Sequence, residues 1–262
     1  MPVFAAQAVT LNFSTESDRI MSRRSVGDRA GQMDDFSYDG ARAGYRLLMQ
    51  QRPEWFRNDP RGGITILTAN ADVDRACEEA QRYRAAHGLS VTDLRAGLLA
   101  RDAYMTIVRD AVRFPDGSLG LYNRIIETEA VAVLPLMAGR PVMMSVFRHG
   151  LRNWSLEFPR GGCDEGEAPE GCAVRELKEE IGANAVTLTS LGGFTPGGSS
   201  ISNRGYLFAA EIDAIGRHDA REGVEDVRAM DVACVERRIM SGEIIDGFSL
   251  ALFTRARLAG HI

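Results

Sequence analysis

The stretch from Gly161 to Ala183, GGCDEGEAPEGCAVRELKEEIGA, decides how the rest of this chain is interpreted. It reads as a glycine, five residues, a glutamate, seven residues, then REL, one residue, EE, one residue and a glycine. If each position matched by chance at roughly 7%, the frequency of a common residue, all of them would match in about one window in 10⁸. The stretch is therefore a motif. Its fixed positions are Gly161, Glu167, Arg175, Glu176, Glu179, Glu180 and Gly182.

The second half of the motif is predicted to be a helix from about Ala168 to Ile181, with Gly182 placed to end it. Because successive helical residues turn by about 100°, the three glutamates of RELKEE share one flank. The adjacent flank is apolar and is expected to face a core. Its residues are Val174, Leu177 and Ile181.

Three carboxylates on one helix flank repel one another unless a cation lies among them. Mg²⁺ or Mn²⁺ would fit, because hard divalent cations prefer carboxylate oxygens and bind phosphate substrates through such groups. The turn-rich loop before the helix, FPRGGCDEGE, could bring backbone oxygens to the same flank. The alternative is a solvated acidic helix face, which the fixed spacing to a glycine loop argues against.

This stretch resembles the Nudix box, the signature of hydrolases that act on nucleoside diphosphates linked to another moiety. Ala183 departs from the family pattern, which usually has a larger aliphatic residue there, and this bears on packing at the helix end. A softer resemblance to ADP-ribose pyrophosphatases covers roughly residues 106–258 and includes Pro196, in the place of that branch's proline. The segment FPRGG also resembles diadenosine polyphosphate and RNA-cap hydrolases, and that branch stays open.

The resemblance implies roles for the box residues. Glu176 and Glu180 would be the principal metal ligands, and Glu179 a further ligand or a base that acts through water. The backbone carbonyl of Arg160 would complete the metal shell. Arg175 would hold the box glutamates in place through a charge-assisted, bidentate bond.

Further candidates lie outside the helix. Arg148, in FRH, matches a substrate-contacting arginine of the family, with a surface ion pair as the alternative. The general base of the ADP-ribose branch often comes from a loop after the box, which makes Glu225 the candidate and Glu222 the second choice. Glu167 would brace the loop rather than bind metal. Two more residues would contact the second moiety of the substrate: Ser199 and Asn203.

The composition is that of an ordinary globular protein, with 45% apolar and 26% charged residues in a chain of 262. A formal net charge of −5 argues against a protein that coats nucleic acid. The four cysteines form no CxxC pair, which favours a reducing, cytoplasmic setting over structural zinc. Apolar runs stay well below the ~20 residues that a membrane helix needs, so no membrane partner is expected.

Two domains are predicted. Residues 1–105 would form an N-terminal extension in which 1–60 are partly mobile and 60–104 form a β-α-α unit, with its second helix beginning at about Thr92. Residues 106–262 would form the Nudix domain. Short apolar strands before and after one central helix, with a helix at the end, predict an α+β fold in which a mixed β-sheet is sandwiched between helices.

The expected function is Mg²⁺-dependent hydrolysis of the diphosphate linkage in ADP-ribose or a related nucleotide sugar, giving AMP and a sugar phosphate. A diadenosine polyphosphate or RNA-cap hydrolase is the nearest alternative, with capped RNA then the only nucleic-acid substrate. A nucleotide-sensing regulator is an alternative of another class, although such sensors commonly lose box glutamates and this chain keeps them all. The N-terminal extension could also make a homodimer.

Overall fold

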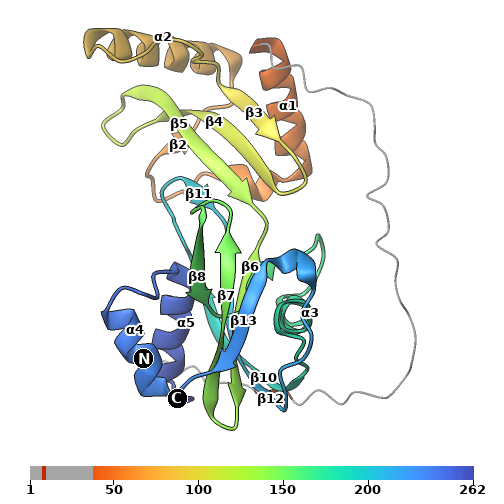
Figure 1. Cartoon of the computed structure of the whole chain (residues 1–262). Coiled ribbons are helices and arrows are strands. Elements are labelled where there is room, and N and C mark those ends of the chain that lie inside the picture. The colour runs from red at the N-terminus through yellow and green to blue at the C-terminus, as the bar shows by residue number, and fades with distance from the viewer. Residues whose placement is uncertain (1–7, 10–37) are drawn as a thin grey trace. The chain divides into compact units, whose positions relative to one another are not determined.

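The computed structural model of the chain describes residues 8–9 and 38–262. They divide into two compact units (Figure 1). The C-terminal unit holds residues 8–9, Thr128–Gly198 and Asn203–Ile262, and the N-terminal unit holds residues 38–127 and Ser199–Ser202. The mobility predicted for residues 1–60 falls, for 1–7 and 10–37, outside the described residues.

The C-terminal unit is built on a mixed sheet with strand order β1-β10-β12-β6-β7-β13, in which β8 pairs with β7 and β9 with β6. Strand β12 runs parallel to β6, while the other pairs are antiparallel. The strands are β1 (Ala8–Val9), β6 (Ala130–Met137), β7 (Arg140–Arg148), β8 (Asn153–Glu157), β9 (Arg160–Gly162), β10 (Ala185–Phe194), β12 (Gly205–Ile212) and β13 (Val224–Ala229).

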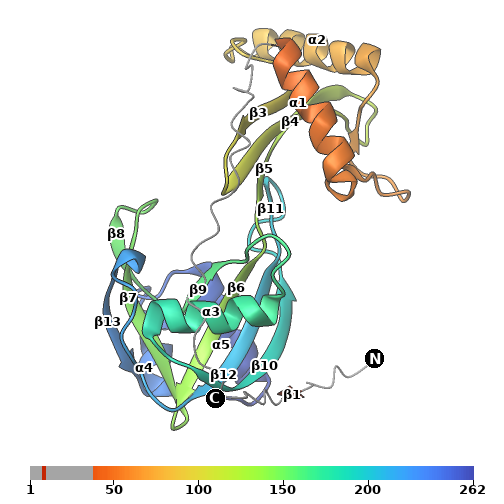
Figure 2. The same ribbon diagram turned by 90° about the vertical axis from the view of Figure 1, so that its right-hand side faces the viewer.

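Helices cover both faces of this sheet. Helix α3 (Pro169–Ile181) lies on one face, and α4 (Val232–Met240) and α5 (Gly247–Leu258) lie on the other (Figures 1 and 2). Strand β6, AVAVLPLM, is therefore buried on both sides, which explains why it is apolar throughout rather than alternating. The predicted mixed sheet between helices is confirmed.

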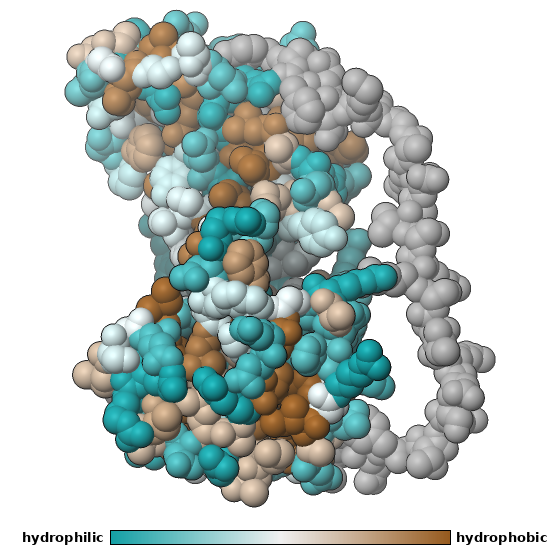
Figure 3. Space-filling model, in the orientation of Figure 1, coloured by the Kyte–Doolittle hydropathy of each residue, from teal (hydrophilic) through white to brown (hydrophobic). Residues whose placement is uncertain are grey.

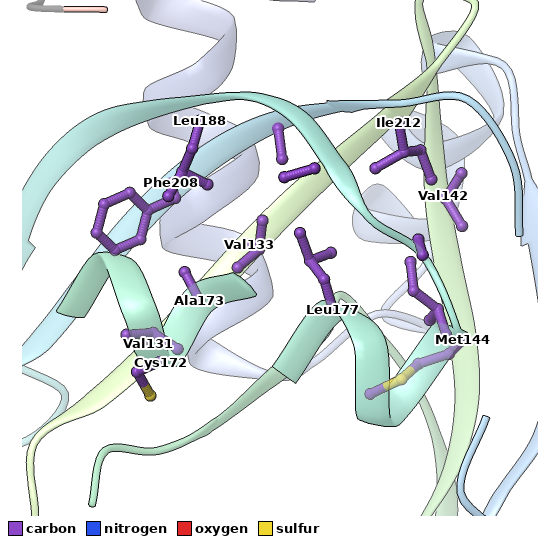
Figure 4. Close-up of a cluster of buried hydrophobic side chains, with 14 of the residues drawn as sticks. Val131, Val133, Val142, Met144, Cys172, Ala173, Leu177, Leu188, Phe208 and Ile212 are labelled. Atoms are coloured by element: carbon purple, nitrogen blue, oxygen red, sulfur yellow. The ribbon is translucent and has the colours of Figure 1, made fainter. Parts of the chain in front are cut away.

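The core between α3 and the sheet fixes where the box helix sits. Figure 4 shows Leu177 and Ala173 of α3 facing the side chains of β6 and β7, among them Val133 and Met144. Leu177 and Ile181 are fully buried, as predicted. At roughly 25 cal/mol per Å² of apolar surface, this burial anchors the helix far more strongly than its intrinsic propensity does.

The N-terminal unit has a second sheet of order β11-β5-β4-β2, with β3 also paired to β4. Helices α1 and α2 lie on opposite faces of it: α1 packs on Val108, and α2 packs on Ala111, which has the opposite strand parity. Its elements are α1 (Tyr38–Gln51), η1 (Pro53–Phe56), β2 (Thr65–Ile66), α2 (Asn70–Ala86), β3 (Gly97–Arg101), β4 (Met105–Arg113), β5 (Leu119–Glu127) and β11 (Ile201–Ser202).

Two expectations differ from this arrangement. The second helix of the β-α-α unit is wrong, because β3 forms there and pairs with β4. Strands β4 and β5 were expected in the Nudix domain, but β4 pairs with β2 and β3, and β5 pairs with β4, so the division of the structure falls between Glu127 and Thr128. Both strands therefore belong to the N-terminal sheet and do not extend the C-terminal one.

The surface has the mixed character that the composition leads one to expect. On the face shown in Figure 3, hydrophilic and hydrophobic side chains alternate over both units. Among the described helices, none combines the length and the apolar character required to span a bilayer.

Candidate active site

Helix α3 presents the box glutamates beside the loop that precedes it. Its C-terminus is closed by Gly182, whose φ of 64° is the left-handed conformation that glycine adopts freely. A Cβ at Gly182 would lie 2.4 Å from the backbone of Gly216, so only glycine fits there. Because the Gly216 amide donates to the Ile181 carbonyl at 3.0 Å, the later loop that carries Glu222 is held against the same helix end.

Arg175 links the loop to the helix. Its guanidinium donates to both oxygens of Glu167, at 3.1 and 2.9 Å, and to the Gly162 carbonyl at 2.8 Å. Its Nη1 also donates to Glu176 Oε1 at 2.7 Å and Glu179 Oε2 at 3.0 Å. Glu167 in turn accepts from the Asp164 amide at 2.9 Å. The geometry matches the bracing expected of Glu167 and the bidentate bond expected of Arg175, although the bidentate partner is Glu167.

Two of the helix glutamates are buried, with only 6% of Glu176 and 2% of Glu180 exposed. Burial raises the pKa of Glu176, and the charges of Glu179 and Glu222 raise it further against the lowering effect of Arg175. Burial, with the charges of Glu176 and Glu222, raises the pKa of Glu180 to about 8 despite a hydrogen bond from the Arg160 amide. These carboxylates are held close together without enough positive charge to balance them.

The loop backbone approaches the glutamates very closely at β9. The Arg160 amide donates to Glu180 Oε2 at 2.7 Å, which places the Arg160 backbone beside that carboxylate. A Cβ at Gly161 would lie 2.2 Å from the carboxyl carbon of Glu176. The first glycine of the motif is therefore required because a buried carboxylate occupies the space of a side chain.

Gly161→Ala should lower activity by about 10²-fold, because the Glu176 carboxylate must move while β9 stays paired to β6, and should cost about 1–3 kcal/mol of stability. The matched control is Gly162→Ala, whose Cβ would meet only the rotatable Thr128 hydroxyl, at 3.2 Å. Steady-state kinetics and thermal unfolding of both variants measure the effect. Equal activity in the two variants would show that the Glu176 position does not matter.

A second cluster of charged side chains lies beside the glutamates. The residue at its centre, Glu157, was not among the candidates from the sequence. Glu157, only 1% exposed, accepts from Arg148 Nη2 at 2.6 Å and from Arg160 Nε at 2.9 Å. Burial raises its pKa, but the hydrogen bond of Arg148 and the charges of both arginines outweigh this and lower it. Asp246, the N-cap of α5, lies 3.2 Å from Arg160 Nη2. The feature of the sequence that points to this cluster is an acidic residue inside the apolar run LEF, three residues before an arginine.

The structure therefore pairs Arg148 with a buried carboxylate rather than leaving its guanidinium free. Its pKa is raised: burial lowers it, but the hydrogen bond and charge of Glu157, together with the charges of Glu180 and Asp246, raise it more. Arg148 lies within electrostatic reach of Glu180, so it belongs to the same site. Its ion pair is buried rather than the surface ion pair considered as the alternative.

The two candidate loop bases differ in placement. Glu222 ends the short helix η2 (Ala220–Glu222), and its charge acts on both Glu176 and Glu180. Glu225 is exposed and stands at the register shift between Val224 and Asp226 in the pairing of β13 with β7. A bulge turns a side chain away from the regular alternation of its strand. The electrostatic coupling to the box thus involves Glu222.

The two substrate-contact candidates after the box fall in different units. Ser199 belongs to the N-terminal unit, in the segment that leads to β11. Asn203 belongs to the C-terminal unit and lies two residues before β12. Phe194 packs against Phe248 at 4.8 Å between ring centroids, and Trp154 against Phe147 at 5.7 Å, so both rings have partners in the C-terminal unit.

The donor atoms suit a hard divalent cation. Within the described residues, no three His, Cys, Asp or Glu side chains are gathered as a ready-made metal group. Arg175 and the Arg160 amide occupy carboxylate oxygens instead. All the candidate donors are nonetheless oxygens, and the pKa values of Glu176 and Glu180 are raised first by burial and then by neighbouring carboxylates, whose negative charge a cation would offset.

Comparisons with known proteins show which family this chain resembles. The sequence profile of the NUDIX domain matches residues 127–245. The ADP-ribose pyrophosphatase of Mycobacterium tuberculosis (strain ATCC 25618 / H37Rv) is 34% identical over 157 residues, which are 57% of this chain and 74% of the relative. The ADP-ribose pyrophosphatase of Bacillus subtilis (strain 168) is 31% identical over 140 residues, 52% of this chain and 75% of the relative.

A solved structure described as the crystal structure of ADP compounds hydrolase superposes with a TM-score of 0.56 at 22% identity. The match covers 64% of this chain and 94% of that one, which confirms the predicted α+β fold of Nudix type. The box, its geometry and these matches agree with one another. The chain belongs to the Nudix hydrolase superfamily, in the branch that resembles ADP-ribose pyrophosphatases.

Proposed function

We propose that the protein hydrolyses the diphosphate linkage of ADP-ribose or a related nucleotide sugar, giving AMP and a sugar phosphate. The observation that carries this is the group of glutamates on α3, with Glu180 buried at a pKa of about 8 against the Arg160 backbone. The relatives named above, which are ADP-ribose pyrophosphatases, support the choice of substrate. The free thiols of all four cysteines support the cytoplasmic location expected from the sequence.

Nudix hydrolases generally use divalent metals, and we propose Mg²⁺, with Mn²⁺ as a substitute. Glu176, Glu179 and Glu180, with the Arg160 carbonyl, would hold it. When bound, such a cation polarises phosphoryl oxygens and lowers the pKa of a coordinated water. Arg175 keeps two of these carboxylates oriented through its bonds at 2.7 and 3.0 Å, so little reorganisation is needed at the moment of reaction.

The proton of the attacking water requires a carboxylate within reach. We assign this role to Glu222, because its charge reaches Glu176 and Glu180 while Glu225 is exposed at a bulge. Arg148, held by Glu157, would present the remaining donors of its guanidinium to a substrate phosphate. The buried Glu157 keeps two arginines, Arg148 and Arg160, oriented beside Glu180.

A substrate panel tests the proposal. Purified protein with Mg²⁺ is given ADP-ribose, other nucleotide sugars, NADH, diadenosine polyphosphates and a capped RNA, and kcat/KM is measured for each. We expect ADP-ribose or another nucleotide sugar to have the highest value. Turnover confined to diadenosine polyphosphates or capped RNA would keep the reaction class and reject the substrate. Binding without turnover across the panel would favour a nucleotide sensor.

The pH dependence of metal binding follows from Glu180. Its folded pKa of about 8 lies above the ordinary glutamate value, so the folded metal-free protein binds more protons than the unfolded chain between these two values. Metal-free stability should therefore fall as pH rises toward 8, while apparent Mg²⁺ affinity rises by up to about tenfold per pH unit. Calorimetric titration with Mg²⁺ at several pH values measures both proton release and affinity. An affinity that is constant below pH 8 would contradict this assignment.

A further inference from the structure

The N-terminal unit contains a cavity of about 360 Å³ that the proposed reaction does not use. It lies between α1, the start of α2 and the sheet edge, and its walls come only from residues 42–111. Small-molecule sites in proteins typically begin at about 300 Å³, so the cavity has room for a ligand of roughly mononucleotide size. The cavity belongs to one folded unit, and therefore needs no contribution from the other.

The cavity arises from the strand pairing. Strands β2 and β3 both pair with the same edge of β4, since β5 occupies the other edge along its whole length. Strand β3 reaches Arg109 and β2 begins at Val112, which leaves Asp110 and Ala111 between them. Ala111 therefore forms part of the floor of the cavity.

Glycines bring α1 over this opening. A Cβ at Gly97 would lie 2.5 Å from the Ala41 carbonyl oxygen, and one at Gly44 would lie 2.8 Å from a methyl group of Leu98. The helix backbone thus rests directly on β3 at one side of the cavity. Tyr45, in the next turn, is fixed by its hydroxyl bond to the buried Asp110. The wall formed by α1 is therefore rigid before any ligand binds.

The charged part of the lining is cationic. It contains three arginines, Arg42, Arg46 and Arg109, and no acidic side chain. Arg42 pairs with Asp74 at 2.6 Å, and its Nε is buried without a hydrogen-bond partner. Arg109 is held by the carbonyl of Asp93 at 2.6 Å.

The surrounding carboxylates engage two of the three arginines, since Asp74 pairs with Arg42 at 2.6 Å and Asp93 lies 3.9 Å from Arg109. Asp110 is engaged by Arg124, and Asp93 by Arg95 at 3.0 Å. Over the part of the chain that the structure describes, no ion pair engages Arg46, which is exposed at the cavity edge. The N-terminus of α2 adds positive potential. Its N-cap residue, Ala69, has no side chain that could accept from the first backbone amides of the helix.

The rest of the lining is apolar, from Leu67 and Val73 at the α2 side to Ala96 and Ala111 at the sheet. An apolar floor beside guanidinium groups suits a molecule with two parts. A flat or aliphatic body would cover the floor, while a phosphate or carboxylate would accept from the arginines in the bidentate manner that Arg favours.

We propose that this cavity is a second binding site, for a small organic anion that carries one phosphate or carboxylate on an apolar body. The site does not include the box glutamates, because the cavity is lined by residues of the N-terminal unit and those glutamates belong to the C-terminal unit. Arg46 supplies the unpaired charge, the guanidinium groups of Arg42 and Arg109 add positive charge that their own partners hold in place, and the apolar floor gives selectivity for the body.

The test is binding of AMP, phenyl phosphate and benzoate to the full-length protein without metal, measured by isothermal titration calorimetry. Inorganic phosphate and benzyl alcohol represent the head and the body alone. The key variant is Arg46→Glu; the matched control is Arg82→Glu, the same charge reversal at an exposed position of α2. Glu180→Gln reports binding at the glutamate site instead.

We expect phenyl phosphate or AMP to bind, or benzoate if a carboxylate is the favoured head, and Arg46→Glu to weaken that binding about tenfold or more. Arg82→Glu and Glu180→Gln should leave it unchanged. The proposal fails if no anionic probe binds, if benzyl alcohol binds as tightly as the anions, if Arg46→Glu has no effect, or if Glu180→Gln removes the binding. A failure to hydrolyse ADP-ribose would not affect this result, because binding at the cavity is measured by calorimetry without metal and not by turnover.

Discussion

Replacing Glu180 by glutamine should lower kcat for ADP-ribose by about 10³-fold while the protein stays folded. The side chain is 98% buried beside Glu176 and the Arg160 amide, so an amide of the same shape fits the space but removes the charge that would bind a cation. Because burial, with the charges of Glu176 and Glu222, raises the pKa of this carboxyl to about 8, removing its charge also removes the cost of a buried carboxylate in the metal-free protein. Its thermal stability without metal should therefore be equal to or above that of the unmodified protein at pH 8.

The matched control is Glu170→Gln, the same substitution at an exposed residue in the first turn of α3. It should keep full turnover. Steady-state kinetics with Mg²⁺ and thermal unfolding with and without Mg²⁺ separate the two expected effects. If Glu180→Gln retained near-normal turnover, Glu180 would not be a metal ligand, and a lower stability at pH 8 without metal would contradict its raised pKa.

Replacing Glu222 by glutamine should lower kcat by about 10²–10³-fold, with a small change in KM, as expected when a positioned base is lost. The charge of Glu222 raises the pKa of both Glu176 and Glu180. Its removal should therefore lower the pKa of both carboxyls. The acidic limb of the pH–rate profile measures this change directly. A structural role alone would alter stability without moving that limb.

Glu225→Gln is the comparison for this prediction, three residues away in the same segment. Its side chain is exposed at the β13 bulge, and its replacement should change kcat by less than about threefold. The reverse order, with Glu225→Gln inactive and Glu222→Gln active, would return the base to the residue that the sequence first suggested. A similar large loss in both variants would indicate that the segment acts through its conformation.

The box region could be predicted from sequence because its constraints are local. The spacing of Leu177 and Ile181 defines one helix face, and Gly182 marks the end of the helix by a conformation that glycine adopts at no cost. The same short range brings Arg175 within reach of Glu179, four residues later. Each of these contacts depends on one turn of helix or on the adjoining loop.

What the sequence did not provide depends on contacts between distant segments. Glu157 and Arg148 meet because β7 and β8 pair, and the advantage of Glu222 over Glu225 depends on a bulge in another pair. The segment around Leu98 has residues that favour a helix, yet its pairing with β4 makes it a strand, and Gly97 enters it at a φ of 128°. Tertiary contacts override local propensity there.

The central claim is that the glutamates of α3 make this chain a metal-dependent hydrolase of a diphosphate. The most direct test follows ADP-ribose by chromatography in the presence of the protein, once with Mg²⁺ and once with EDTA. We predict equal amounts of AMP and ribose 5-phosphate with Mg²⁺ and unchanged ADP-ribose with EDTA. Identical product formation in both samples, or cleavage of the glycosidic bond to ADP and ribose-derived products, would contradict the account.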